Sequence, residues 1–239
     1  MRSVLQLENV NAFYDKSHIL FDLNIEEEEG SSICILGRNG VGKSTTMKTI
    51  MGIMNPKNHC KTEGRILING WDAVGSPTNK IAQAGIAYVP QGRHIFPNLT
   101  TKENLLIAKR KGLDGKTAWD IEQIYALFPR LKERANSMGG KLSGGEQQML
   151  AVARGLMQNP QIMLLDEITE GLAPIIVDQL SDIVQVLVKQ GVTILLAEQN
   201  VAFALKVSER CYIMEKGSIV HESPNKQLSS ETIARYLGA

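Results

Sequence analysis

The sequence has few of the features that would place a protein in a membrane or outside the cell. None of its apolar runs approaches the length of about 20 residues that a membrane-spanning helix requires. Residues 1–10 alternate between apolar and polar side chains, as a strand does, and show no segment typical of a signal peptide. We therefore expect neither a transmembrane segment nor a signal peptide, and a chain that stays in the cytosol.

Cysteine and net charge are also scarce. The three cysteines, Cys34, Cys60 and Cys211, are far apart and lack a paired metal-ligand spacing, which argues against a disulfide framework and a zinc site. The 26 basic and 25 acidic residues almost cancel, so no global field attracts nucleic acid or an anionic membrane. Nucleic acid is therefore not expected as the main partner. The glutamate run of residues 26–29 is expected to form a solvated turn before Gly30.

Short β-rich runs recur along the chain and alternate with helical patterns. The runs are residues 4–10, 33–36, 66–68, 86–89, 162–165, 192–197, 211–214 and 219–221. Several are apolar throughout, as strands buried on both faces are. Helical periodicity is clearest over residues 176–190, with Gly191 as the stop signal. This alternation predicts an α/β architecture.

Strand patterns disappear between residues 93 and 157. Helical segments dominate there, at residues 103–111, 120–128 and 146–157. We expect a single domain over residues 1–239, whose α/β core of residues 1–92 and 158–239 is split by a helical subdomain of residues 93–157. A chain of 239 residues is too short for a tandem of two such cores.

The sequence GRNGVGKS at residues 37–44 fits the phosphate-loop pattern and follows an apolar run, as such a loop should. Glycines let successive backbone N–H groups turn inward around phosphate oxygens, and the following helix adds the positive end of its dipole. Lys43 is expected to reach the β- and γ-phosphates, and the Ser44 hydroxyl to bind Mg²⁺. The pattern predicts that the chain binds a nucleoside triphosphate. The residues expected to contact it are Gly37, Arg38, Asn39, Gly40, Val41, Gly42, Lys43, Ser44 and Thr45.

Two adjacent carboxylates, Asp166 and Glu167, follow the apolar run of residues 162–165. Neighbouring residues that leave a strand project in different directions, so one carboxylate can hold Mg²⁺ while the other faces the water that attacks the γ-phosphate. We assign Asp166 to the metal and Glu167 to the water, as general base. An acidic pair after a strand does not by itself indicate a function. In a chain that also has a phosphate loop, it indicates a role in nucleotide hydrolysis.

The segment KLSGGEQQ at residues 141–148 places a serine and two glycines directly before a helical pattern. Ser143 can cap that helix, and the exposed N–H groups of Gly144 and Gly145 could receive a γ-phosphate. A simple N-cap explains the spacing equally well. One triphosphate seldom needs two cradles from one chain.

Together, LSGGEQ, GRNGVGKS, MLLDE and the intervening Gln91 resemble the nucleotide-binding subunits of ABC transporters, over essentially the whole chain. The resemblance implies the P-loop NTPase core of an ABC ATPase, with a β subdomain and an inserted helical subdomain, and hydrolysis of ATP with Mg²⁺. In that family two copies bind head to tail, and each ATP lies between the phosphate loop of one copy and the signature of the other. Ser143, Gly144, Gly145 and Glu146 would then contact the ATP of the partner.

The resemblance also gives roles to residues that their spacing alone does not single out. It implies that Gln91 contacts Mg²⁺ and the attacking water, and that Tyr14 stacks on adenine. Taken alone, Gln91 would be a surface residue and Tyr14 a packing residue at a strand end. Gln199 stands at the switch-histidine position, where it can hydrogen-bond the γ-phosphate but cannot take up charge. Two further residues depart from the family pattern. Ala173 stands where many members have an aspartate at the dimer interface. Ile168 replaces the proline that usually follows the acidic pair, which allows a looser turn.

Within the family, the chain most resembles importers of branched-chain, or hydrophobic, amino acids. The segments that carry this likeness are residues 88–100, 127–134, 142–154, 170–177 and 195–200. Subunits of urea and short-amide importers share much of them, so the solute stays open. A soluble ABC ATPase acting on DNA or ribosomes would need a coiled-coil insertion or a second cassette, and only 51 residues separate Gln91 from Ser143. A regulatory module without turnover is a third alternative.

The resemblance further implies the partners and the location. It implies a second ABC ATPase subunit, identical or a sister chain, and permease subunits that bind near residues 91–104, where His94, Ile95, Phe96 and Leu99 offer apolar and aromatic contacts. Ordinary packing explains Phe96 and Leu99 equally well. A periplasmic solute-binding protein would act indirectly. The expected location is the cytoplasmic face of the plasma membrane, as a peripheral subunit.

Overall fold

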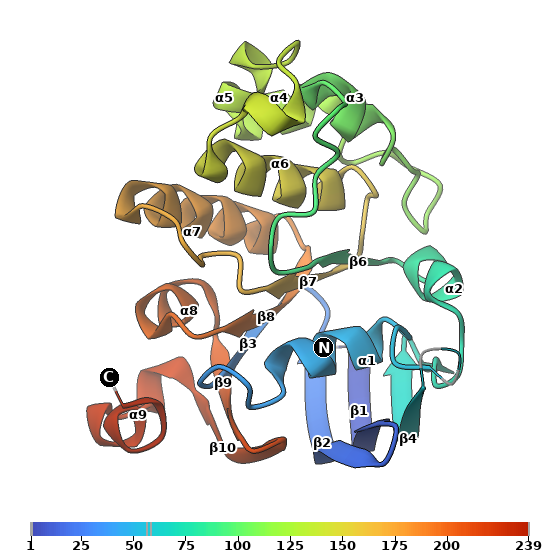
Figure 1. Cartoon of the computed structure of the whole chain (residues 1–239), viewed down its shortest axis with the longest axis vertical. Coiled ribbons are helices and arrows are strands. Elements are labelled where there is room, and N and C mark those ends of the chain that lie inside the picture. Colours follow the sequence, from blue (N-terminus) through green and yellow to red (C-terminus); the bar gives the residue numbers. More distant parts are fainter. Residues whose placement is uncertain (1, 56, 58, 239) are drawn as a thin grey trace.

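The computed structural model describes residues 2–55, 57 and 59–238, which form two β-sheets with helices packed between and around them (Figure 1). The antiparallel sheet has the order β2-β1-β4-β5, with β1 (Ser3–Tyr14), β2 (Ser17–Glu28), β4 (Cys60–Ile68) and β5 (Trp71–Asp72). The larger sheet has the order β10-β9-β3-β8-β7-β6, with β3 (Ser32–Leu36), β6 (Ile86–Val89), β7 (Ile162–Asp166), β8 (Thr193–Glu198), β9 (Arg210–Glu215) and β10 (Ser218–Pro224).

Strands β6, β7, β8, β3 and β9 of the larger sheet are parallel, and β10 joins the edge in the antiparallel direction. Every residue of β3, β7 and β8 is buried. Strands that are covered on both faces read as continuous apolar runs, which explains why the sequence pattern locates them. All eight predicted strands are present in the structure.

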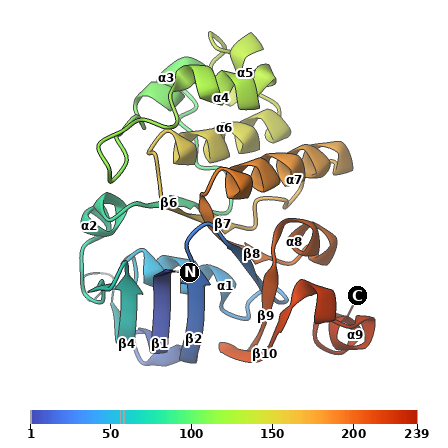
Figure 2. The same cartoon turned by 180° about the vertical axis from the view of Figure 1, so that it is seen from behind.

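Helices cover both faces of the larger sheet. Helix α1 (Lys43–Ile50) lies between the two sheets, where its Met47 and Ile50 are fully buried in a core shared by both. The opposite face is covered by α6 (Gly144–Leu156), α7 (Pro174–Lys189) and α8 (Val201–Val207), as both views show (Figures 1 and 2). Two short helices, α2 (Thr78–Gln83) and α9 (Ser230–Leu237), lie elsewhere in the chain.

The chain between β6 and β7 is helical, at the end of the molecule far from the antiparallel sheet (Figure 1). It contains α3 (Thr101–Leu106), α4 (Ile121–Leu127), α5 (Pro129–Glu133), a 3₁₀ turn (Gly139–Lys141) and α6. In this part of the structure the only strand-like pairing is one bridge between Thr100 and Met138. Helix α3 ends five residues earlier than predicted. The exact limits of a helical subdomain, residues 93–157, stay a prediction.

The prediction for the glutamate run was wrong for residues 26–28, whereas Glu29 lies in an exposed turn before Gly30. Glu26, Glu27 and Glu28 end β2, a strand that the sequence pattern missed together with the short β5. Because strand residues alternate between faces, Glu27 points inward and is fully buried. Its Oε1 accepts a hydrogen bond of 2.7 Å from the Ser31 hydroxyl, and its Oε2 has no hydrogen-bond partner among the described residues. Burial raises the pKa of this carboxyl well above its usual value.

No helix within the described ranges has both the length and the hydropathy needed to cross a bilayer.

Candidate active site

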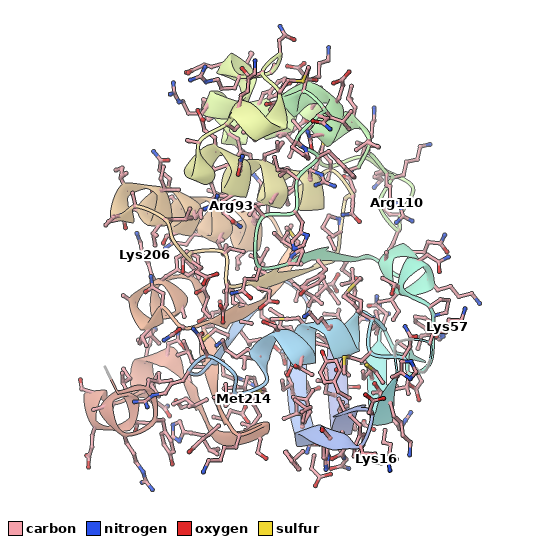
Figure 3. The ribbon with its side chains drawn as sticks, in the orientation of Figure 1. Lys16, Lys57, Arg93, Arg110, Lys206 and Met214 are labelled. Carbon is pink, nitrogen blue, oxygen red and sulfur yellow. The ribbon has the colours of Figure 1, made fainter. Side chains whose placement is uncertain are left out.

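The phosphate-loop sequence forms the turn between β3 and α1, as predicted. Gly40 and Gly42 have φ angles of 80° and 117°, a region that side chains disfavour. At Gly37 an added Cβ would lie 2.7 Å from the backbone oxygen of Met214, which is labelled beside this turn in Figure 3. The three glycines are therefore needed for the path of the loop itself. Arg38 and Asn39 of this loop are exposed.

Lys43 is the first residue of α1, and its side chain turns back into the loop with only 2% exposure. Its Nζ donates to the carbonyl oxygens of Gly37 at 2.8 Å and Arg38 at 3.1 Å. The same ammonium lies 2.9 Å from Oε1 of Glu167. The positive charge is thus held at the mouth of the loop by three oxygen atoms.

Ser44 and Asp166 meet although 121 residues lie between them in the chain. The Ser44 hydroxyl donates to Oδ1 of Asp166 at 2.9 Å, and the Tyr88 hydroxyl donates to Oδ2 at 2.8 Å. Burial raises the pKa of Asp166, and the two hydrogen bonds oppose that rise. Sequence reasoning gave Tyr88 no role. Its position near the carboxyl end of β6, beside β7, was the available signal.

Both carboxylate oxygens of Glu167 have a partner. While Lys43 binds Oε1, the amide of Gln91 donates to Oε2 at 2.9 Å and to Glu170 Oε2 at 2.8 Å. The backbone of Glu167 has a φ of 47°, and its N–H donates to the carbonyl of Ala197 in β8 at 2.8 Å. A non-glycine residue in this region costs about 1–3 kcal/mol and persists only where its surroundings hold it. The chain therefore leaves β7 through a strained, anchored turn.

Gln199 follows directly after β8 and is exposed. It lines a pocket of about 290 Å³ together with Glu167, Thr169, Glu170, Glu198 and Asn200. The structure thus brings Lys43, Ser44, Gln91, Asp166 and Glu167 into one connected cluster, with Gln199 at its edge.

Two sets of predicted site residues lie outside this cluster. Tyr14 is 38% exposed at the end of β1, opposite Ser17 and Cys60 in the strand register. Ser143 is the N-cap of α6 and forms a capping box with Glu146. No hydrogen bond or ion pair in the described part of the chain connects residues 143–146 to residues 37–45. Ser143 is exposed and thus open to another molecule.

The donor atoms at Ser44 and Asp166 suit a small, hard cation. Mg²⁺ is bound in proteins through one or two carboxylates, with phosphate and water oxygens completing its shell. The described residues contain no group of three or more His, Cys, Asp and Glu side chains that could hold a metal by themselves. The site fits a cation that arrives with a polyphosphate.

Residues 20–170 match the family described as ABC transporter. The chain belongs to the ABC transporter family. It is 39% identical to BraG of Pseudomonas aeruginosa, a high-affinity branched-chain amino acid transport ATP-binding protein, over 98% of this chain and 100% of that protein. It is 35% identical to LivF of Archaeoglobus fulgidus, a probable branched-chain amino acid transport ATP-binding protein, with 94% of each chain covered.

The fold points to the same family. The dimeric structure of an ATP-binding cassette in a post-hydrolysis state, bound to ADP and phosphate, superposes with a TM-score of 0.77 at 25% identity. The match covers 94% of this chain and 100% of that one. The predicted fold class, a P-loop NTPase core of the ABC type, is therefore confirmed, and the chain is an ABC ATPase.

Proposed function

We propose that this ABC ATPase binds ATP with Mg²⁺ and hydrolyses it to power an importer of branched-chain, hydrophobic amino acids. The observation that carries the hydrolytic part is the cluster that joins the phosphate loop to the end of β7. Lys43, Ser44, Asp166 and Glu167 are linked there by contacts of 2.9 Å. The solute class is supported by the likeness to BraG and LivF.

In this arrangement Lys43 and Glu167 bind each other, so neither is free to act on ATP until the ion pair opens. To bind the β- and γ-phosphates, the ammonium of Lys43 exchanges Glu167 and the loop carbonyls for phosphate oxygens. Glu167 is then released to act as general base on the attacking water. Gln91, which already donates to Glu167, orients that water, and Gln199 senses the γ-phosphate from the edge of the site.

The remaining ATP contacts follow from the loop and the strand ends. The N–H groups of residues 37–45 cradle the phosphates, and Tyr14 stacks on adenine. Ser44, Asp166 and Gln91 would hold Mg²⁺, which neutralises charge on the phosphates when bound. We also propose the division into a core and a helical subdomain at residues 93–157.

We propose that a second ABC ATPase subunit, identical or a sister chain, completes each site. The exposure of both Ser143 and the loop residues Arg38 and Asn39 supports a head-to-tail pairing in which these surfaces meet. Ser143, Gly144, Gly145 and Glu146 would then contact the partner's ATP. The likeness to a dimeric cassette supports the same pairing.

The permease subunits are proposed to bind beside β6. A pocket of about 370 Å³ lies there, and Pro90, His94 and Arg154 are among the residues that line it. Phe96 is 44% exposed, with the Arg154 guanidinium 4.5 Å from its ring. Ile95 packs partly against the core, so His94 and Phe96 are the better candidates for contact. The chain would thus work at the cytoplasmic face of the plasma membrane, indirectly with a periplasmic solute-binding protein.

The shared sites can be tested by mixing two inactive variants. A dimer of one Lys43→Ala chain and one Ser143→Arg chain contains one intact site. In that site the unchanged phosphate loop of the Ser143→Arg chain faces the unchanged signature of the Lys43→Ala chain. We expect phosphate release to return on mixing and to be absent from either variant alone. Activity of Ser143→Arg alone would refute the shared site. Asp120→Arg, which removes the equivalent cap of α4, is the matched control and should stay active.

The transported solute needs a separate experiment. Cells with and without this subunit would be given labelled leucine, urea and acetamide. Loss of leucine uptake alone is the expected result. Loss of urea or acetamide uptake with leucine unaffected would replace the amino-acid assignment with the amide class.

A further inference from the structure

Glu198, the last residue of β8, carries a buried carboxylate that the proposed function does not use. The residue is only 2% exposed. Both of its carboxylate oxygens accept hydrogen bonds from the same residue, Thr169. The backbone N–H of Thr169 donates to Oε1 at 3.2 Å and the Thr169 hydroxyl donates to Oε2 at 2.9 Å. The Glu198 side chain is thus bound at two points by one residue, through the backbone N–H and the hydroxyl of Thr169.

This double contact lies between the two segments that handle the γ-phosphate. Thr169 comes two residues after Glu167, and Glu198 directly precedes Gln199. Strands β7 and β8 are neighbours, with Asp166 opposite Ala197 in the register. The contact therefore ties the turn that carries the general base to the start of the segment that carries the γ-phosphate sensor.

The turn needs such a tie because it is strained and has no proline. Glu167 has a φ of 47°, and the residue that follows it is Ile168 rather than a proline, which would fix the backbone. Ile168 itself is 1% exposed and packs into the core below the turn. Beyond Thr169, the side chain of Glu170 accepts a hydrogen bond from Gln91. Movement of Thr169 would therefore displace both Glu167 and the amide that orients the water.

A charged Glu198 is energetically unfavourable at this buried position. Burial raises the pKa of its carboxyl to about 7, and the nearby negative charge of Glu167 adds to that rise. Buried polar groups are retained when their hydrogen bonds hold a specific geometry, and a smaller neutral residue would avoid the cost of burial. The geometry of the turn is the property that this carboxylate can supply here.

We propose that Glu198 is a positioning residue for hydrolysis, which acts through Thr169 to hold Glu167 and Gln91 in line with the γ-phosphate and Gln199. The inference rests on the proposed ATP hydrolysis. Neither Glu198 nor Thr169 is proposed to contact ATP. Their loss should therefore lower kcat and leave the KM for ATP nearly unchanged.

The test removes the Thr169 hydroxyl and then restores it. Thr169→Val should lower kcat for phosphate release about tenfold or more, since small misplacements of reacting groups have large kinetic effects. Thr169→Ser, which keeps the hydroxyl, should stay close to the starting chain. Glu198→Gln, which keeps one acceptor oxygen, should fall between them. The KM for ATP should stay within about twofold throughout.

A matched control separates positioning from general loss of stability. Thr193 lies at the opposite end of β8, is fully buried, and its hydroxyl accepts a hydrogen bond of 2.9 Å from the N–H of Gly30. Thr193→Val removes a comparable buried hydroxyl far from the site. It should lower the melting temperature by a similar amount and leave kcat unchanged. An equal fall in kcat for both valine variants would overturn the inference.

Other outcomes are also decisive. A Thr169→Val variant with unaltered kcat, or with a raised KM and unaltered kcat, refutes the positioning role. Glu167→Gln is assayed in parallel to separate this inference from the proposed function. If Glu167→Gln hydrolyses ATP normally, the proposed general base is wrong. If Glu167→Gln is inactive and Thr169→Val is fully active, only the role of Glu198 fails.

Discussion

The coupling free energy of the buried ion pair between Lys43 and Glu167 can be measured directly. The Nζ–Oε1 distance is 2.9 Å, and the two side chains are 2% and 10% exposed. At an effective dielectric constant of about 20, two unit charges at this distance attract each other by about 6 kcal/mol. Desolvation of both groups removes part of this gain. We expect a net coupling of about 2–3 kcal/mol, at the upper end of the range for residues in contact.

The perturbation is a double-mutant cycle of Lys43→Met, Glu167→Gln and the combined variant. Each protein would be unfolded in urea without nucleotide, with the fluorescence of Trp71 and Trp119 as the signal. The coupling is the free energy of unfolding that the two single changes fail to explain when they are added. The losses of the two single variants should add up to more than the loss in the combined variant, and the excess is the coupling.

An exposed ion pair in the same chain supplies the control. Lys206 and Asp178 lie 3.1 Å apart, with side chains 42% and 67% exposed. Solvent screening should reduce the coupling of that pair to about 1 kcal/mol or less. If the coupling of Lys43 with Glu167 is equally small, the two groups are not held together in solution. The proposed exchange of Glu167 for phosphate would then lose its basis.

Three further predictions concern the base, the metal and a buried carboxyl. Glu167→Gln should lower kcat by about 10²-fold or more while nucleotide binding survives, as measured by phosphate release and by nucleotide titration. Ser44→Ala should raise the Mg²⁺ concentration needed for half-maximal hydrolysis, and an unshifted Mg²⁺ titration would contradict its role. Burial raises the pKa of Glu27 in the folded chain above the pKa that it has in the unfolded chain. The contribution of Glu27 to stability therefore falls as the pH rises above the pKa of the unfolded chain. Glu27→Gln should therefore stabilise the chain more at pH 8 than at pH 5 in urea unfolding, and an equal effect at both pH values would contradict this.

The phosphate loop and the strands of the larger sheet could be predicted because their signals are local. Glycines at positive φ and a strand that is apolar on both faces leave direct marks in a short stretch of sequence. The position of Asp166 and Glu167 at the end of such a strand follows from the same marks. Parallel strands end at one edge of a sheet, so these carboxylates were expected near Lys43.

The roles of Glu27, Tyr88 and Glu198 depend on which strands become neighbours. The run of glutamates in β2 looks solvated, and only the packing of the two sheets makes the middle one a buried residue. Tyr88 reaches Asp166 because β6 pairs with β7, and Glu198 reaches Thr169 because β8 pairs with β7. No local pattern contains the order of strands in a sheet.

The sequence alone therefore determined the elements and the chemical groups, because backbone preferences and burial leave periodic or fixed-spacing traces. The tertiary structure decided which of those groups touch. Contacts between Ser44 and Asp166, or between Thr169 and Glu198, join segments that are far apart in the chain. They arise only when the sheet brings the ends of its strands to the same edge, where direct contact and burial change what each side chain can do.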